Sequence, residues 1–597
     1  MGDSAGPGRA PPESTGRPGP PSPVPWALRE YALLADGERG ALVDPHGAVA
    51  WMCAPRWHDD AVFSALVGGA GDFTVCPDDP WHVGDGRYED GTLIRVSRWT
   101  LSEGITECRD ALALPADTTR AVLLRRVRAV RGPAVTRVRL RVRAGFGTHR
   151  TTGLHRADGV WHARSGPLHL RLDGLAHAAP DPEDGTLTAL LSVPDGGTHD
   201  LVLELAERPR EGPLDPEYLW RRTEAAWAEA VPGCHALPAA GDVRQAYAVL
   251  TGLTSRSGGM VAAATTSLPE RAAAGRDYDY RYAWLRDQCF AGTAVATHGP
   301  HRLTDTAVRF VTARLTEDGP ALRPAYRVDG GAVPPERPLG LPGYPGGSDR
   351  VGNRAGHQFQ LDVFGEALTL LAAAARAGRA DADTVRAAGI AARAVEENWR
   401  RPDAGLWEIE PDRWTHSRLA AVTGLRAAAK ALPGPAADRW TSLAEAIGRE
   451  TERTCRHPTG RWQRSPTDPG PDGALLRPLA LDPRLAADPG LPATREAVER
   501  ELSDQGYVYR FRHGDDPLGR HEGAFLLCGH FMTAACLAEG RTAAAGRWFE
   551  RTRSACGSPG LYAEEYDVAQ RQLRGNLPQA FVHALLLENA VRLADAA

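Results

Sequence analysis

The sequence predicts a multidomain protein in which an N-terminal antiparallel β-sandwich is followed by an all-helical domain. The chain of 597 residues is too long for one ordinary hydrophobic core. From about Tyr31 to Ala206, apolar and polar residues alternate in short runs, which is typical of half-buried antiparallel strands. Beyond about residue 240, apolar residues recur every three or four positions, which is typical of amphipathic helices.

The N-terminal elements follow from composition and alternation. Residues 1–25 are rich in proline, glycine and serine and lack the apolar core of a signal peptide, which predicts a disordered tail. Residues 26–210 contain the alternating runs GTLIRVSRW, AVLLRRVRAV, LHLRLDG and HDLVLELA, separated by glycine, proline and aspartate. This pattern predicts that 26–210 form the β-sandwich domain.

The C-terminal elements are helical. LDPEYLWRRTEAAWAEAV predicts a linking helix within residues 211–240, and about a dozen helices fit into residues 241–597. Long loops that carry distinctive residues join these helices. We therefore expect a toroid of paired helices whose ligand site lies where the loops converge.

Composition narrows the possible partners and location. The 70 basic and 75 acidic residues give a net charge of -5, which offers no general attraction for nucleic acid or anionic membranes. The sequence contains no uninterrupted apolar stretch of about 18 residues, so a membrane-spanning helix is not expected. The nine cysteines are scattered and include no CxxC pair, so neither a disulfide framework nor a zinc site is expected. We expect a cytoplasmic protein with a small neutral partner; the sequence leaves its oligomeric state open.

The loop RDYDYRYAWLRDQCF, residues 276–290, places aromatic rings beside charged groups. Aromatic faces cover the weakly apolar C–H side of a sugar, and charged groups bind its vicinal hydroxyls in pairs. A helix start with structural ion pairs has the same composition. The residues alone leave both interpretations open.

Two separate glutamates could perform general acid and base chemistry. Glu408 follows Trp407, whose indole could partly desolvate the carboxylate and favour its protonated form. Near the C-terminus Glu564 and Glu565 are adjacent, so only one of them can enter a given pocket and the other is expected in solvent. Inverting cleavage of a glycosidic bond needs an acid and a base roughly 6.5–9.5 Å apart, and Glu408 and Glu564 could form that pair.

Three segments resemble the signature regions of glycoside hydrolase family 15, in its bacterial glucoamylase and trehalase branch. They are YRYAWLRD, GLWE with THS soon after, and YAEEYD followed by GNLPQAFVH. Further segments, including LPGYPGGSDRVGNRAGHQFQLDVFGE and HEGAFLLCGHFMTAACLAEG, resemble the same branch in the same order. The resemblance covers nearly everything after the tail. It implies an N-terminal β-sandwich followed by an (α/α)6 barrel.

The resemblance also implies residue roles. Glu408 matches the general acid and Glu564 the general base, which makes Glu565 a structural neighbour. Arg286 and Asp287 match the pair that clamps hydroxyls of the terminal glucose. The full set of expected substrate-binding residues is Tyr280, Trp284, Arg286, Asp287 and Trp407. Such a clamp implies exo action, in which glucose is released one unit at a time. The acid and base pair implies inversion, and this chemistry needs neither a metal nor an organic cofactor.

Other polar residues have less definite roles. The middle segment offers Asn353, His357, Gln358, Gln360 and Asp362, each of which could line the site or be structural. Isolated histidines are more often packing residues than metal ligands, so we expect no metal site at His416, His521 or His530. Glu522 is expected to brace a loop rather than contact sugar.

The sequence departs from the branch near the second sugar. IEPDRW follows Glu408 where a glycine-containing, arginine-bearing loop is usual, and RLAAVTGLRAA follows THS where a lysine and a tryptophan-containing helix are usual. These changes leave the substrate open between trehalose, which is slightly favoured, and α-1,4- or α-1,6-linked glucosides. The alternatives are a phosphorylase, which could dispense with the base, a non-catalytic α-glucoside-binding protein, and a purely structural repeat protein.

Overall fold

The computed structural model describes residues 25–272 and 274–597, so residues 1–24 of the predicted tail lie outside the described residues. The N-terminal part contains two eight-stranded sheets in which every neighbouring pair is antiparallel. The first sheet has the order β1-β2-β3-β5-β10-β15-β14, with β4 paired to β3. Its strands are β1 Ala32–Ala35, β2 Gly40–Val43, β3 Ala48–Cys53, β4 Ala61–Phe63, β5 Asp72–Pro77, β10 Ala134–Arg141, β14 Ala179–Pro180 and β15 Leu187–Val193.

The second sheet has the order β11-β12-β13-β16-β9-β8-β7-β6. Its strands are β6 His82–Tyr88, β7 Arg95–Leu101, β8 Ile105–Leu112, β9 Arg120–Arg131, β11 Thr151–Ala157, β12 Val160–Ser165, β13 Leu168–Asp173 and β16 Thr198–Ala206. Apolar side chains from both sheets, such as Val75, Val138 and Leu203, pack into one buried core. Each such side chain contributes about 1.5–3 kcal/mol when it is fully buried, which explains why the alternating pattern predicts a sandwich.

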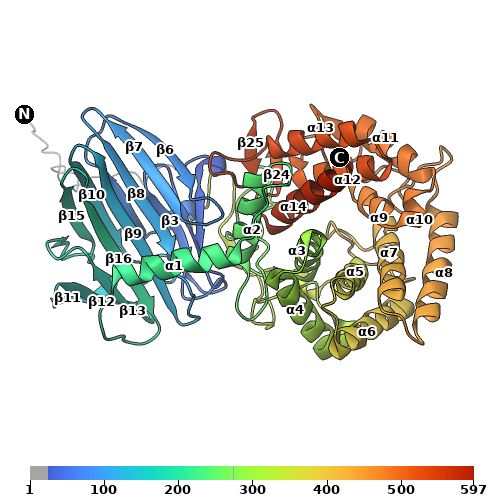
Figure 1. The fold of residues 1–597 in the computed structure, drawn as a ribbon, viewed down its shortest axis with the longest axis horizontal. Helices are drawn as coiled ribbons and strands as arrows, with labels where there is room; N and C mark the ends of the chain where they lie inside the picture. The colour runs from blue at the N-terminus through green and yellow to red at the C-terminus, as the bar shows by residue number, and fades with distance from the viewer. Residues whose placement is uncertain (1–24, 273) are drawn as a thin grey trace, which may run out of the picture.

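Helix α1, Pro216–Ala230, follows the last strand of the sandwich. It begins at a proline, and the side chain of Asp215 accepts a hydrogen bond from the backbone N–H of Tyr218, a regular N-cap. Its buried face, which includes Trp220 and Trp227, belongs to a core shared with the helical part. In Figure 1, α1 runs alongside the sandwich toward the helices.

Six inner helices of the described chain form a closed ring, because each contacts the next in the order α3, α5, α7, α9, α12, α14 and back to α3. Six further helices, α2, α4, α6, α8, α11 and α13, pack outside the ring (Figure 1). The inner helices are α3 Leu285–His298, α5 Asp362–Arg376, α7 Thr415–Ala431, α9 Leu476–Leu481, α12 Leu526–Ala538 and α14 Ala580–Asp595. The outer helices are α2 Ala240–Leu253, α4 Arg302–Asp318, α6 Ala382–Asn398, α8 Ala437–Cys455, α11 Gly490–Leu502 and α13 Thr542–Arg553. This arrangement is an (α/α)6 barrel.

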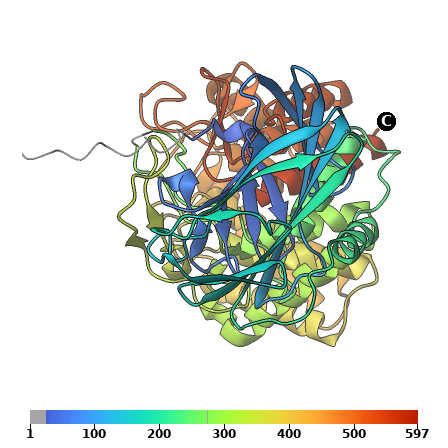
Figure 2. The same cartoon turned by 90° about the vertical axis from the view of Figure 1, so that its left-hand side faces the viewer.

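The sandwich packs against the barrel through a loop that precedes α3. The guanidinium of Arg281 is buried between the two parts and donates hydrogen bonds to the carbonyl oxygen of Asp59, at 3.0 Å, and to the sulfur of Cys53, at 3.2 Å. The indole of Trp51 likewise donates to the carbonyl oxygen of Ala264 at 2.9 Å. Figure 2 shows the sandwich in front of the barrel helices. The sandwich therefore braces a loop that also reaches the cavity described below.

None of the helices in the described ranges is both long and apolar enough to cross a membrane.

Candidate active site

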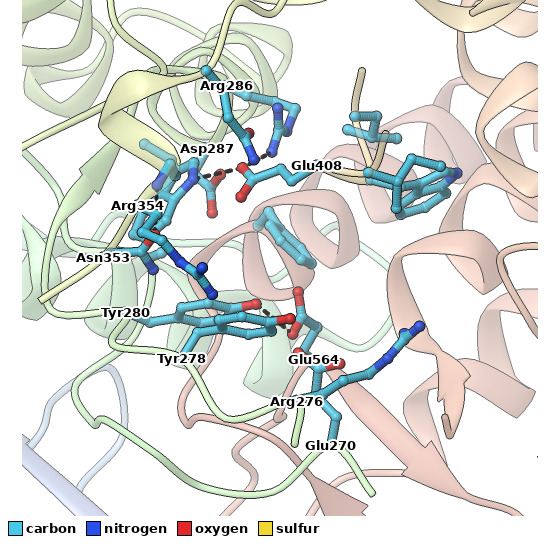
Figure 3. Close-up of a pocket in the computed structure, with 18 of the residues that line it drawn as sticks. Glu270, Arg276, Tyr278, Tyr280, Arg286, Asp287, Asn353, Arg354, Glu408 and Glu564 are labelled. Atoms are coloured by element: carbon cyan, nitrogen blue, oxygen red, sulfur yellow. Dashed lines mark hydrogen bonds and ion pairs between the residues drawn. The ribbon is translucent and has the colours of Figure 1, made fainter. Parts of the chain in front are cut away.

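The loops that precede the inner helices converge on one cavity of about 490 Å³. Trp284 precedes α3, Glu408 lies in the loop before α7, and Glu564 lies in the segment before α14. Figure 3 shows Glu408 with Arg286 and Asp287 on one side of this cavity, and Glu564 with Tyr280 on another. Residues separated by more than a hundred positions are thus brought together, as the sequence predicts for such a toroid.

The loop that carries Glu408 is held by a buried carboxylate. Asp403 accepts hydrogen bonds from the backbone N–H of Gly405, at 3.2 Å, and from the hydroxyl of Ser417, at 2.7 Å. It also pairs with Arg418 at 2.5 Å. Ser417 and Arg418 directly follow His416 in the first turn of α7, so the THS motif anchors the turn that presents Glu408.

Glu408 adopts a left-handed backbone conformation, with φ of +54°, which is uncommon for a residue with a Cβ atom. Its Oε1 accepts a 2.7 Å hydrogen bond from the indole of Trp284 and a 3.0 Å hydrogen bond from Arg286. Both contacts use the same oxygen, and no residue in the described part of the chain donates a hydrogen bond to Oε2. The Glu408 side chain is 26% exposed, which leaves it accessible from the cavity.

The indole in contact with Glu408 is that of Trp284, whereas the sequence suggested Trp407. The Trp407 indole donates a 2.9 Å hydrogen bond to Asp472, and its ring packs on Phe525. Trp407 still lines the cavity. Because neighbouring residues in a tight turn point in different directions, adjacency in sequence did not predict this contact.

Arg286 and Asp287 occupy the first turn of α3 and are both buried. Besides Glu408, Arg286 contacts Gln360 at 2.6 Å and Asp362 at 3.4 Å, which fixes its guanidinium at the cavity wall. Burial raises the pKa of Asp287 to about 7, although the charge of Arg286 opposes that shift. The arrangement can present a fork of donors and a carboxylate to adjacent sugar hydroxyls.

Glu564 lies immediately before β24, Glu565–Asp567. Its Oε2 accepts a 3.0 Å hydrogen bond from the hydroxyl of Tyr280, and its backbone oxygen accepts one from the N–H of Leu526. Burial and the nearby charge of Glu270 raise its pKa well above that of an ordinary glutamate. A carboxylate with a raised pKa is a stronger base than an exposed one.

Glu565 is not in solvent, as the alternation of adjacent side chains alone suggested. It is buried, and its Oε2 accepts a 2.6 Å hydrogen bond from the backbone N–H of Gly523. Strand β24 pairs with β23, Ala524–Phe525, so Glu565 joins two loops of the site. Its contacts are those of a structural residue.

The polar residues of the middle segment divide into two groups. Asn353, His357 and Gln358 line the cavity, whereas Gln360 and Asp362 contact Arg286 behind it. Glu522 pairs with Arg276 and Arg510, which fits the loop-bracing role expected for it.

His416, His521 and His530 do not line the cavity. His416 and His530 are buried, and burial lowers the pKa of each to about 3, so both are neutral. His521 contacts Asp516 at 2.6 Å. Among the residues that the structure describes, no cluster of histidine, cysteine, aspartate or glutamate side chains is arranged to hold a metal ion.

The sequence did not single out several residues that line the cavity. They are Glu270, Tyr278, Arg354, Arg510, Phe525 and Phe581. Glu270 ends the segment TTSLPE, which lies before the aromatic loop and carries no local signal of chemistry. The pairing of the two segments, seen in the bond from the N–H of Glu270 to the oxygen of Arg276, is needed to place it.

Two family models match successive parts of the chain. Residues 243–591 match the model of the family described as glycosyl hydrolases family 15, and residues 25–215 match that of a trehalase-like N-terminal domain. A crystal structure of a bacterial glucoamylase complexed with acarbose superposes with a TM-score of 0.68 at 14% identity, covering 98% of this chain and 96% of the other. That likeness confirms the predicted fold.

Two curated relatives span nearly the whole chain. A trehalase of Mycolicibacterium smegmatis is 29% identical over an alignment of 637 positions, gaps included, that covers 96% of this chain and 93% of the relative. Trehalase 1 of Sulfolobus acidocaldarius is 27% identical over an alignment of 590 positions that covers 94% of this chain and 98% of the relative. Because the family model covers more than half of the chain, the protein belongs to glycosyl hydrolases family 15 and is a glycoside hydrolase that acts on a carbohydrate.

Proposed function

We propose that this protein is an inverting, exo-acting α-glucosidase whose substrate is trehalose. The observation that carries the choice of sugar is that relatives named trehalase match it over more than nine tenths of their own length. The cavity supports the choice of mechanism, because it places two carboxylates, Glu408 and Glu564, on different sides of a space that a sugar ring can fill. A cytoplasmic location remains a prediction from sequence.

In this mechanism Glu408 protonates the glycosidic oxygen as the bond to C1 lengthens. Glu564 removes a proton from a water molecule on the opposite face of the sugar, and the water oxygen attacks C1. The electron pair of the broken bond stays on the departing oxygen, which keeps the proton from Glu408. The first product is therefore β-glucose, and this step uses neither a metal nor an organic cofactor.

The terminal glucose would bind at the end of the cavity formed by Trp284, Arg286 and Asp287. Arg286 is held by Gln360 and Asp362, so its donors are fixed before substrate arrives. Fixed donors lose little conformational entropy on binding and favour one orientation of the sugar. A closed clamp of this kind accepts a chain end and supports exo action.

The substrate is tested with purified protein and four sugars: trehalose, maltose, isomaltose and a maltooligosaccharide, each with and without inorganic phosphate. We expect the highest kcat/KM on trehalose. A preference for a maltooligosaccharide would move the protein to the glucoamylase type, and formation of a sugar 1-phosphate would make it a phosphorylase. Binding without any product would indicate a sugar-binding protein.

Replacing Arg286 by alanine should lower kcat/KM on trehalose by about 10³-fold, because the change removes a charged hydroxyl donor and leaves buried Asp362 unpaired. Arg286→Lys keeps the charge but loses the planar fork, so we expect an intermediate loss. Steady-state kinetics measure both effects, and thermal unfolding reports whether the fold survives. A loss of less than tenfold in a folded Arg286→Ala enzyme would contradict the clamp.

Replacing Tyr280 by phenylalanine should lower kcat about tenfold with little change in KM, because a hydrogen bond to the base is lost. That bond lowers the pKa of Glu564, so its removal raises the pKa further. The base must be ionised to act, and the acidic limb of the kcat/KM profile should therefore move to higher pH. Tyr278→Phe, at the neighbouring cavity position, serves as a control that should leave this limb in place.

A further inference from the structure

A third carboxylate, that of Glu270, lies at the cavity and has no part in the mechanism above. Glu270 is only 5% exposed and lines the same cavity as Glu564, which is equally buried. Figure 3 shows its side chain next to Glu564, on the side of the cavity away from Glu408. Glu270 is therefore on the side where the mechanism requires the attacking water.

Gly575 marks how closely the two glutamates approach. A Cβ atom added at Gly575 would lie 3.7 Å from Cγ of Glu270, 3.7 Å from Cβ of Glu564 and 3.8 Å from Oε2 of Glu564. The glycine has a φ of +78°, a conformation that L side chains rarely adopt. Side-chain atoms of both glutamates thus lie within van der Waals distance of one point beside Gly575, which itself carries no side chain.

Glu270 also lacks the hydrogen-bond donors that its neighbours have. Glu564 receives the Tyr280 hydroxyl, Glu565 receives the N–H of Gly523, and Glu522 receives Arg510. Among the described residues, no group donates a hydrogen bond to the Glu270 carboxylate. A buried carboxylate without a donor is costly, so the remaining candidate donor is a molecule in the cavity.

We propose that Glu270 is a second water-binding carboxylate, which holds the attacking water together with Glu564. This inference rests on the proposed role of Glu564. One proton of the water passes to Glu564 as the water oxygen bonds to C1. The second hydrogen stays on the water oxygen and forms a hydrogen bond to Glu270 during the attack. This remaining O–H group becomes the new hydroxyl of β-glucose. With both hydrogens directed to carboxylates, a lone pair of the water faces C1.

The charges around the pair predict a measurable coupling. The other titratable or charged groups near Glu270 or Glu564 include Arg276, Asp277, Tyr278, Tyr280, Asp287, Arg510, Glu522 and Glu565. Burial raises the pKa of Glu270 to about 7, while Arg510 and Arg276 oppose that shift. When Glu270 is ionised, its negative charge favours the protonated form of Glu564 and so raises the pKa of the base.

The first test is Glu270→Gln, which removes the charge but keeps an oxygen that accepts a hydrogen bond. Loss of the charge should lower the pKa of Glu564 and move the acidic limb of kcat/KM to lower pH by about one unit or more. Glu38→Gln provides a control, because Glu38 is also buried but contacts Ser255 and Arg256 outside the cavity. An acidic limb that stays in place in Glu270→Gln would overturn the proposal.

The second test is Glu270→Ala on two substrates, trehalose and α-glucosyl fluoride. Fluoride leaves without protonation, so the rate of glucosyl fluoride hydrolysis depends on activation of the attacking water and not on the general acid. We expect kcat to fall by about 10- to 100-fold on both substrates, because the water loses one of its two acceptors. A change of less than threefold on the fluoride would also overturn the proposal.

Different results would contradict the role of Glu270 and the proposed function. If the wild-type protein hydrolyses both substrates with inversion and the Glu270 variants behave like wild type, only the role of Glu270 fails. If wild type hydrolyses neither, the proposed function itself fails, and the role of Glu270 fails with it.

Discussion

The Glu408→Gln enzyme should hydrolyse trehalose about 10³-fold more slowly than wild type, because an amide cannot protonate the departing oxygen. Glutamine keeps the size of the side chain and its Oε1, which accepts hydrogen bonds from Trp284 and Arg286. KM and the temperature of unfolding should therefore change little. The loss should appear almost entirely in kcat.

Glucosyl fluoride separates this loss from general damage to the site. Because fluoride needs no proton, Glu408→Gln should retain most of the wild-type activity on that substrate. Glu410, two residues further along and exposed, provides the matched control, and Glu410→Gln should lose less than tenfold on trehalose. A Glu408→Gln enzyme with near-normal kcat on trehalose would remove Glu408 from the role of acid.

The Glu564→Gln enzyme should lose about 10³- to 10⁴-fold in kcat on both trehalose and glucosyl fluoride, because an amide cannot remove a proton from the attacking water with either leaving group. This pattern differs from that of Glu408→Gln, which spares the fluoride. Steady-state kinetics on the two substrates therefore assign one role to each glutamate. If Glu564→Gln hydrolysed glucosyl fluoride as fast as Glu408→Gln does, the assignment of Glu564 as base would be contradicted.

Two further variants make the test of Glu564 specific. Glu565→Gln keeps an oxygen for the N–H of Gly523, so this adjacent buried glutamate should lose less than tenfold in kcat. Glu564→Ala leaves space for an external nucleophile, and added azide should restore turnover with β-glucosyl azide as the product. Failure of azide to restore any turnover in a folded Glu564→Ala protein would argue against a missing base.

Much of the fold was predictable because it depends on local periodicity. Alternation in β10 and three-to-four spacing in outer helices such as α8 each follow from one face being buried. The brace at Arg281 was not predictable in the same way. Its partners Cys53 and Asp59 lie more than two hundred positions away in the other domain, and no periodic pattern connects them.

The site was predictable only in part. The motifs led to Glu408, Glu564 and the residues around Arg286, all of which the structure brings to one cavity. The burial of Glu565 depends on the pairing of β24 with β23, which the sequence around it does not specify. Glu270 is placed by a loop that folds back on the aromatic segment, so its proximity to Glu564 is a tertiary property.

If Glu408 and Glu564 act as acid and base, trehalose is hydrolysed with inversion at one glucose. Proton NMR at early times, before mutarotation, measures the anomers directly. Inversion at C1 of the attacked glucose gives β-glucose, while the departing glucose keeps its α configuration, so we expect equal amounts of the two anomers. Release of α-glucose alone would mean retention at C1 and would contradict the pairing of Glu408 with Glu564 as acid and base.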